Sequence, residues 1–318
     1  MKLRGIDFGH VLDASGARGW FGEGHLFHPF IPGLSFEGST FVAKTTTLNP
    51  NRGNANMRRD GLTARVFPQR AVKVNLREAA VMNAFGLPGP GLRVLLDQGR
   101  WQTRTAPFFL SFMAIGKSPE ERLEEVRGFV RMLKPALPNF AARIGLQVNF
   151  SCPNVHADKY IDDFAAHLQE YQQLGIPVMV KLSAAQEVDL ALRIAAIEGC
   201  DGLCVSNSIP WGAFPNRIDW KHLFGERSPL EAFGGGGLSG APIFPIVVDW
   251  VKKALAGGLR KPLNAGGGIT SSSDVDVLVT AGARSIFVGS IAIVRGWRLQ
   301  KTIQHANARL AAVESLAA

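Results

Sequence analysis

Short apolar runs recur along the chain, and each ends in a polar residue or in glycine. The clearest covers residues 144–150, where every second residue is large and apolar and a buried strand is predicted. The sequence Ser151-Cys152-Pro153-Asn154 stops this strand, because proline cannot continue a central strand. Asn149 and Asn154 bracket Cys152, which places two amide groups around one potential acid or base. Polar chemistry is therefore expected where this strand ends.

Seven further apolar runs resemble this one, and helical patterns separate several of them. The eight predicted strands cover residues 41–44, 79–83, 107–112, 144–150, 177–182, 202–207, 262–265 and 285–289. Helices are predicted over 118–133, 160–174 and 185–196, the first with Ser118 as its N-cap. Strands that alternate with helices pair in parallel, and eight of them form a closed (β/α)8 TIM barrel. We therefore predict one α/β domain over residues 1–318.

Two stretches fall outside this alternation. Residues 13–16 are predicted to form a turn of small residues, followed by a glycine-rich surface loop. Residues 208–240, after the sixth strand, carry several aromatic residues and four consecutive glycines at 234–237. An insertion of this size usually builds a lid or a subunit interface, and we predict that role here.

The predicted strand ends are polar or glycine-rich. In a barrel of this kind the active site lies at the carboxyl ends of the strands. The residues found there are Lys44, Asn83, Asn149, Lys181, Asn207, Gly266 to Gly268, Gly289 and Ser290. Packing does not require such residues at so many strand ends, so we expect them to form one site.

Glycine loops at the seventh and eighth strands indicate a phosphate site. Gly266–Gly268 precede a helix predicted to begin between residues 270 and 273, and Gly289-Ser290 leads into another helix. Backbone amides and helix dipoles at this place in the fold favour an anion. With lysines nearby the site would suit flavin mononucleotide (FMN), whose reduced form a lysine stabilises. An isomerase or aldolase of phosphorylated sugars would use the same phosphate end, with a Schiff-base lysine.

The composition and net charge limit the kinds of ligand that can be expected. The 318 residues are 46% hydrophobic with a mean hydropathy of +0.08, values that fit a soluble protein with a large core. The net charge is +9, but the basic residues are dispersed and no nucleic-acid signature is present, so anionic small molecules are the expected ligands. No apolar stretch reaches 18 residues, and we expect no membrane association. Three cysteines suit no disulfide framework, so a cytoplasmic location is expected.

Several motifs, in order along the chain, resemble those of class 1 (soluble) dihydroorotate dehydrogenases, FMN-dependent enzymes built on a (β/α)8 barrel. The central one is Asn149-Phe-Ser-Cys-Pro-Asn154. The others are Ala14-Ser15-Gly16, Val42-Ala-Lys44-Thr45, Arg52-Gly-Asn54 with Arg58, Asn83-x-x-Gly86-Leu87, Val180-Lys181-Leu182, Ser206-Asn207-Ser208, Gly237-Leu-Ser-Gly240, Gly266-Gly-Gly-Ile269 and Val288-Gly289-Ser290.

The resemblance implies a role for each of these positions. Cys152 would be the catalytic base, taking a proton from C5 of dihydroorotate while hydride leaves C6 for flavin N5. The substrate would be held by Lys44, Asn83, Gly86, Leu87, Asn149, Asn154, Asn207 and Ser208. The flavin would be lined by Ala14, Ser15, Gly16, Lys44, Thr45, Asn149, Lys181, Gly240, Gly266, Gly267, Gly268, Gly289 and Ser290.

The chain departs from the family pattern at three places. Ala84 replaces a hydroxyl or longer side chain, Gly89 replaces a common asparagine, and residues 155–160 lack the usual proline or glycine. A second hypothesis is therefore an FMN-dependent oxidoreductase of dihydropyrimidines or another cyclic amide. That group shares the Ser-Cys-Pro element but has its working cysteine further along the loop, where this chain has none. A flavin-free phosphate-binding barrel is the third hypothesis, and a nucleic-acid binder the fourth.

The electron acceptor is left open by the sequence. Soluble relatives use fumarate, or NAD⁺ through a separate iron–sulfur flavoprotein subunit. This chain has too few cysteines to hold a cluster itself. The same relatives suggest a homodimer, and no metal site is expected.

Overall fold

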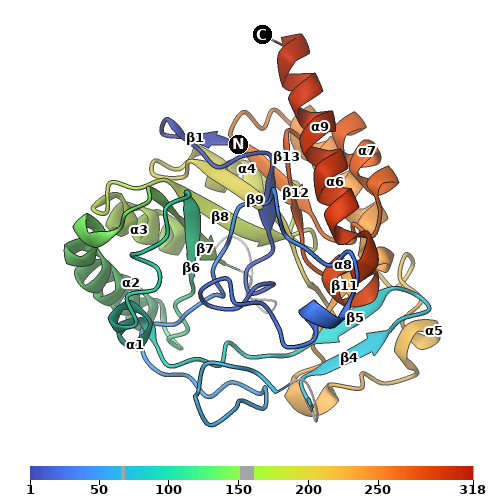
Figure 1. Ribbon diagram of the computed structural model, residues 1–318, viewed down its shortest axis with the longest axis horizontal. Coiled ribbons are helices and arrows are strands. Elements are labelled where there is room, and N and C mark those ends of the chain that lie inside the picture. Colours follow the sequence, from blue (N-terminus) through green and yellow to red (C-terminus); the bar gives the residue numbers. More distant parts are fainter. Residues whose placement is uncertain (66–68, 151–160, 318) are drawn as a thin grey trace.

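A curled sheet of seven parallel strands forms the centre of the computed structural model, which describes residues 1–65, 69–150 and 161–317 (Figure 1). In sheet order the strands are β3 (Val11–Asp13), β13 (Ser285–Val288), β12 (Leu263–Gly266), β9 (Gly202–Asn207), β8 (Val178–Ser183), β7 (Ile144–Asn149) and β6 (Phe108–Phe112). Each of these strands is buried over nearly all of its length, as expected for a parallel sheet covered on both faces.

The segment 40–46 closes this sheet into a barrel. It makes isolated parallel bridges to β3 on one side (Leu12 with Thr40) and to β6 on the other (Val42 with Phe109, Thr46 with Phe112). The ring therefore has eight members, and the predicted strand at 41–44 is one of them. The (β/α)8 prediction is confirmed in architecture.

One predicted barrel strand is wrong. Residues 79–83 form β5 (Ala80–Asn83), which belongs to a separate antiparallel sheet of order β10, β11, β5, β4. The other members are β10 (Ile209–Pro210), β11 (Gly237–Gly240) and β4 (Val72–Asn75). The eighth barrel strand is instead β3, which was not predicted and whose last residue, Asp13, begins the predicted turn. Residues 79–83 were misassigned because a four-residue apolar run carries no signal for parallel or antiparallel pairing. The strand β3 was not recognised because three buried residues are too few to show a period.

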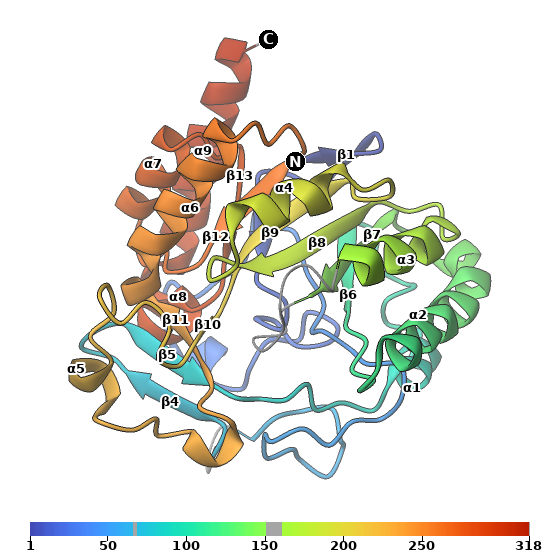
Figure 2. The ribbon, with the colours of Figure 1, turned by 180° about the vertical axis from the view of Figure 1, so that it is seen from behind.

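Helices cover the outside of the barrel (Figures 1 and 2). The longer ones are α2 (Pro119–Leu133), α3 (Ile161–Gln172), α4 (Val188–Ala196), α6 (Phe244–Ala256), α7 (Ser272–Thr280) and α9 (Leu299–Ala317). The short ones are α1 (Leu92–Asp97), α5 (Trp220–Phe224) and α8 (Ile291–Val294). The Ser118 hydroxyl accepts from the Glu121 amide at 3.2 Å, which confirms the predicted cap of α2.

Smaller elements complete the described chain. An N-terminal hairpin consists of β1 (Lys2–Leu3) and β2 (Ile6–Asp7). Single 3-10 turns are η1 (His28–Phe30), η2 (Lys134–Asn139), η4 (Glu231–Phe233), η5 (Ala241–Ile243) and η6 (Gly296–Arg298). Two strands of the antiparallel sheet, β10 and β11, come from the predicted insertion. They pair with each other, and β11 also pairs with β5. No helix in the described ranges is long and apolar enough to cross a membrane.

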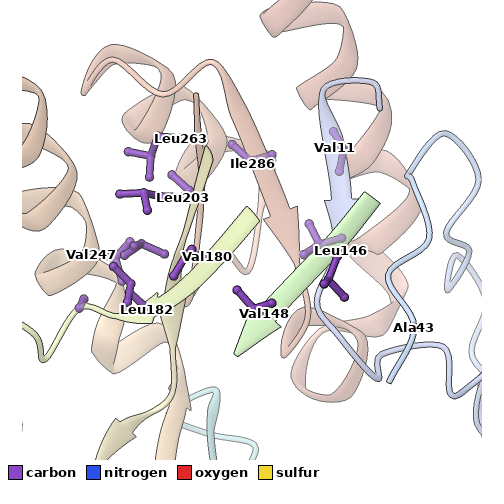
Figure 3. Packing of buried hydrophobic residues seen from close by; sticks show 14 of the residues in the cluster. Val11, Ala43, Leu146, Val148, Val180, Leu182, Leu203, Val247, Leu263 and Ile286 are labelled. Carbon is purple, nitrogen blue, oxygen red and sulfur yellow. The ribbon is translucent and has the colours of Figure 1, made fainter. Parts of the chain in front are cut away.

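Alternation along the barrel strands separates two apolar layers. Leu146, Val180, Leu203 and Ile286 belong to the larger cluster, which also includes Val247 of α6 (Figure 3). Their strand neighbours form a second cluster, which contains Leu12, Val42, Phe109, Met179, Cys204 and Phe287. Because side chains two residues apart share a face, Lys44 lies on the side of Val42 and Lys181 on the side of Met179. Both lysines are therefore on the inner face of the barrel, near its carboxyl end.

Candidate active site

A cavity of 190 Å³ opens where the barrel strands end and the antiparallel sheet begins. It brings together ten residues that the sequence predicted for the site: Ala14, Ser15, Asn83, Lys181, Asn207, Ser208, Gly267, Gly268, Gly289 and Ser290. Ser206, Ser239, Ile243, Ile269 and Phe287 complete its lining. These residues come from both ends of the chain and from its middle, so only the folded barrel assembles them.

Backbone forms one end of this cavity. A Cβ atom at Gly289 would lie 2.6 Å from the Cβ of Ala14. One at Gly268 would lie 2.8 Å from the carbonyl oxygen of Gly240, and the φ of Gly268 is +88°. Gly267 has a φ of +107°, and Gly266 would place a Cβ 2.5 Å from the carbonyl oxygen of Phe287. Glycine is therefore required here both by conformation and by close approach.

The start of α7 is less open to a ligand than predicted. The helix begins within the predicted range, with Ser271 as its N-cap. The carboxylate of Asp274 accepts from the amides of Thr270 and Ser271 at 2.8 and 3.0 Å. These two amides are thus paired within the chain. A phosphate would instead rely on the backbone of the glycine loops and on Ser290.

Lys181 brings an amine into the cavity from the end of β8. It is 8% exposed, and burial lowers its pKa. No carboxylate in the described ranges forms an ion pair with it. An anionic or electron-rich ligand would supply the missing partner, since a buried cation is stable only when it is paired.

Two asparagine side chains, those of Asn83 and Asn207, line the cavity. The side-chain amide of Asn207 donates to the side-chain oxygen of Asn149 at 3.1 Å, and the Ser208 amide donates to the oxygen of Asn207 at 3.0 Å. Asn83 at the end of β5 donates to the carbonyl of Gly237 at 3.4 Å. Asn149, predicted for the same site, lines a second cavity of 300 Å³ beside α2 and α3 and not this one. Asn83 and Asn207 can donate to, and accept from, the amides of a cyclic substrate.

The turn after β5 is held by two asparagines. Asn51 donates to the carbonyls of Gly86 and Leu87 at 2.8 and 2.9 Å. Asn54, which belongs to the Arg52-Gly-Asn54 motif, donates to the carbonyl of Ala84 at 2.9 Å. Asn51 is in no predicted motif, and its partners lie 35 and 36 residues further along the chain, so no local pattern indicates the contact. The predicted substrate residues Gly86 and Leu87 are fixed by these bonds but are not in the lining of the 190 Å³ cavity.

Lys44, on segment 40–46, is not in the lining of the 190 Å³ cavity, although its side chain lies against Gly16, which follows the lining residue Ser15. Its ammonium donates to the carbonyl of Pro88 and lies 4.0 Å from the ring centre of Trp20. Burial lowers the pKa of Lys44 to about 7, and the charge of Glu23 opposes this shift. Trp20 was not predicted for the site, because it stands beside Phe21 in a glycine-rich stretch that matches an ordinary surface loop.

Hydroxyl groups connect the first loop to the barrel. The Ser15 hydroxyl donates to the carbonyl of Ala43 at 2.8 Å and lies 2.9 Å from the hydroxyl of Thr45, which in turn lies 2.9 Å from that of Ser111. Gly16 lies against the Lys44 side chain, because a Cβ there would be 3.4 Å from its Cγ. The remaining predicted flavin residue, Gly240, ends β11 with a φ of +102°.

Cys152 and Asn154 lie outside the described residues, between β7 and α3. Their predicted roles therefore stay predictions. In the described part of the chain no group of three His, Cys, Asp or Glu residues could hold a metal ion.

Comparison with known proteins identifies the family. The family model described as dihydroorotate dehydrogenase matches residues 5–310. The NAD⁺-type catalytic subunit of dihydroorotate dehydrogenase B from Halalkalibacterium halodurans is 30% identical over 282 residues, covering 86% of this chain and 81% of that protein. The fumarate-type dihydroorotate dehydrogenase A from Lactobacillus delbrueckii subsp. bulgaricus is 29% identical over 302 residues, covering 91% and 86%.

A solved structure supports the fold. The dihydroorotate dehydrogenase of Eimeria tenella, in complex with ferulenol, superposes with a TM-score of 0.66 at 19% identity, covering 99% of this chain and 84% of that one. Its agreement with the barrel concerns architecture alone, and the family model carries the assignment. The chain therefore belongs to the dihydroorotate dehydrogenase family, the FMN-dependent oxidoreductases of pyrimidine biosynthesis.

Proposed function

We propose that the 190 Å³ cavity is the place where this family member binds FMN and oxidises dihydroorotate to orotate, with Cys152 as the general base. The observation that carries the proposal is Lys181, a buried amine that faces the cavity with no carboxylate partner in the described ranges. The glycine backbone lines the same cavity. A cation and an anion-binding backbone in one cavity suit a flavin with a phosphate tail.

The residues fit this cofactor by shape as well as by charge. At Gly268 and Gly289 a Cβ would clash with other atoms of the protein, so only glycine lets the chain pack this closely, and the backbone of both residues lines the cavity. Lys181 would lie against the flavin ring and stabilise negative charge there. When bound, FMN supplies the hydride acceptor for the reaction.

The substrate would lie between the asparagine amides and Lys44. The Asn207 amide already orients that of Asn149, so the two present a fixed pattern of donors and acceptors. The Lys44 ammonium would neutralise a carboxylate. Cys152 follows Asn149 by three residues, and it must lose its proton before it can accept one from the substrate.

The route of the electrons divides the relatives into two types. Some are named as NAD⁺-type catalytic subunits and others as fumarate-type enzymes, at 30% and 29% identity. We propose that this chain passes electrons to a separate subunit, because the relatives of the first type are named as catalytic subunits. Turnover with fumarate by the purified chain alone would contradict this. A homodimer and a cytoplasmic location stay predictions.

The test is the visible absorption spectrum of anaerobic purified protein, before and after dihydroorotate is added. We expect bleaching of a flavin band in the wild type. Cys152→Ala should keep the flavin and lose at least about a hundredfold in reduction rate, as expected for loss of a general base. Cys200→Ala, which removes a buried free thiol elsewhere, is the matched control. A flavin band that dihydroorotate leaves unchanged would move the substrate to another reduced pyrimidine or cyclic amide.

A further inference from the structure

Trp20 supports the side chain of Lys44. The indole is fully buried, and its ring centre lies 4.0 Å from the Lys44 ammonium, which is the geometry of a cation–π interaction. Two hydrogen bonds fix Trp20: its ring nitrogen donates to the carbonyl of Leu62 at 2.9 Å, and its own carbonyl accepts from the ring nitrogen of Trp101 at 2.6 Å. The position of the Lys44 amine therefore depends on a rigid aromatic surface.

Gly89 provides the space for that ring. A Cβ at Gly89 would lie 2.7 and 2.8 Å from two atoms of the six-membered ring of Trp20. The φ of Gly89 is not positive, so its backbone would accept another residue if the indole were absent. Gly89 and Asn51 exchange two backbone hydrogen bonds, at 2.8 and 2.9 Å, which keep this segment close to the ring. Pro88, the preceding residue, accepts a hydrogen bond from Lys44.

We propose that Trp20 and Gly89 are a matched pair that positions Lys44 for the anionic group of the substrate. This rests on the proposed function, in which Lys44 contacts the substrate carboxylate. Trp20 acts through Lys44 and is a positioning residue. The pair also restricts the pocket, because no side chain at position 89 can extend toward the substrate while the indole is in place.

Two other titratable groups face Lys44. The carboxylate of Glu23 accepts from the amides of Trp20 and Phe21 at 3.0 and 2.7 Å, so its charge is fixed by the same loop. Burial lowers the pKa of His25, and the charge of Lys44 adds to that shift. Burial is also the larger influence on Lys44, so replacing the indole by a smaller group should admit water and raise the pKa of the amine.

The first experiment measures the titration of Lys44 directly in flavin-loaded protein. The side-chain NMR signal of Lys44, assigned with Lys44→Arg, is followed from pH 6 to 10 in Trp20→Leu, Trp20→Phe and Gly89→Ala. We expect the midpoint to rise by at least about one pH unit in Trp20→Leu and in Gly89→Ala, and by less in Trp20→Phe, whose ring keeps more of the amine covered from water.

Two variants control for lost packing. Trp250→Phe removes an indole donor of similar geometry, 2.9 Å from the carbonyl of Gln186 on the far side of the barrel wall. Gly296→Ala places a Cβ 2.9 Å from the Cδ1 of Leu34 and 3.2 Å from the Cγ2 of Ile31, a comparable clash with other side chains. Both should lower thermal stability and leave the Lys44 midpoint unchanged.

The second readout separates binding from chemistry. We expect Trp20→Leu and Gly89→Ala to raise the KM for dihydroorotate about tenfold and to change kcat by less than about threefold, because they displace a binding group. Equal titration midpoints in all five variants would overturn the proposal. A shifted midpoint in a protein whose flavin dihydroorotate does not bleach would support the pair and overturn the substrate assignment.

Discussion

The two halves of the proposed site are built in different ways. In the half beside β12 and β13, backbone lines the cavity, and a Cβ added at Gly268 or Gly289 would lie less than 3 Å from other atoms of the protein. In the half on segment 40–46, a side chain supplies the functional group, and the Lys44 ammonium lies 4.0 Å from the ring centre of Trp20. The shape of the first half can change only if the backbone moves, whereas the shape of the second half can be changed by substituting single side chains. Cofactor binding should therefore be sensitive to any substitution, and substrate binding should be tunable.

The largest effect is expected in the backbone half. In Gly268→Ala the new Cβ would lie 2.7 Å from that of Phe244 and 2.8 Å from the carbonyl of Gly240, at a φ of +88°. We expect FMN affinity to fall by at least about a hundredfold, since both conformation and contact oppose the side chain. The measurement is flavin content and titration with free FMN. Gly258→Ala, with a φ of +93° and open space around it, should keep wild-type affinity.

An intermediate effect is expected at Lys181, which the proposed function places against the flavin ring. Lys181→Met removes a buried amine whose pKa burial lowers. FMN affinity should fall about tenfold, because the electrostatic contact is lost. The flavin-free variant should be more resistant to urea than the wild type, by about 1.4 kcal/mol for each unit by which burial lowers the pKa. A variant that is destabilised without flavin would show that Lys181 has a partner in the apoprotein.

The smallest effect is a pH dependence in the side-chain half. The pKa of Lys44 is about 7 in the folded protein and 10.5 ordinarily. Between these values the unfolded chain holds a proton that the folded chain has lost, so this group makes the free energy of unfolding rise with pH. The gain is at most about 1.4 kcal/mol per pH unit. Urea unfolding of flavin-free protein at pH 6 to 9 should show Lys44→Met most stabilised at pH 6, with the difference shrinking toward pH 9.

Much of the barrel could be predicted from the sequence, because its central strands are buried on both faces. The strands at 107–112, 177–182 and 202–207 are largely apolar, and each ends close to the predicted residue. The same pattern misassigned residues 79–83, since four apolar residues look alike in a barrel and in an antiparallel sheet. It also missed β3, which is only three residues long.

Site residues could be predicted where their role follows from their place at a strand end. They could not be predicted where their role depends on a partner distant in the sequence. Lysines, asparagines and glycines at strand ends could be recognised from their positions alone. Trp20 and Asn51 act through contacts that the fold creates, with Lys44 and with the 86–87 turn. A sequence pattern within one element contains no record of such pairings.

The pairing of β3 with β13 has a consequence for assembly. Val11 to Asp13 align with Ile286 to Val288, and the amide of Ala14 donates to the carbonyl of Val288 at 2.7 Å. The ring cannot close until nearly the whole chain is available, and such distant pairings form slowly. Ala14 and Gly289, which line the cofactor cavity, meet only at this junction. Bound flavin would therefore contact residues from the N-terminal and the C-terminal parts of the chain at once. Its release would weaken the contact between β3 and β13 that closes the barrel.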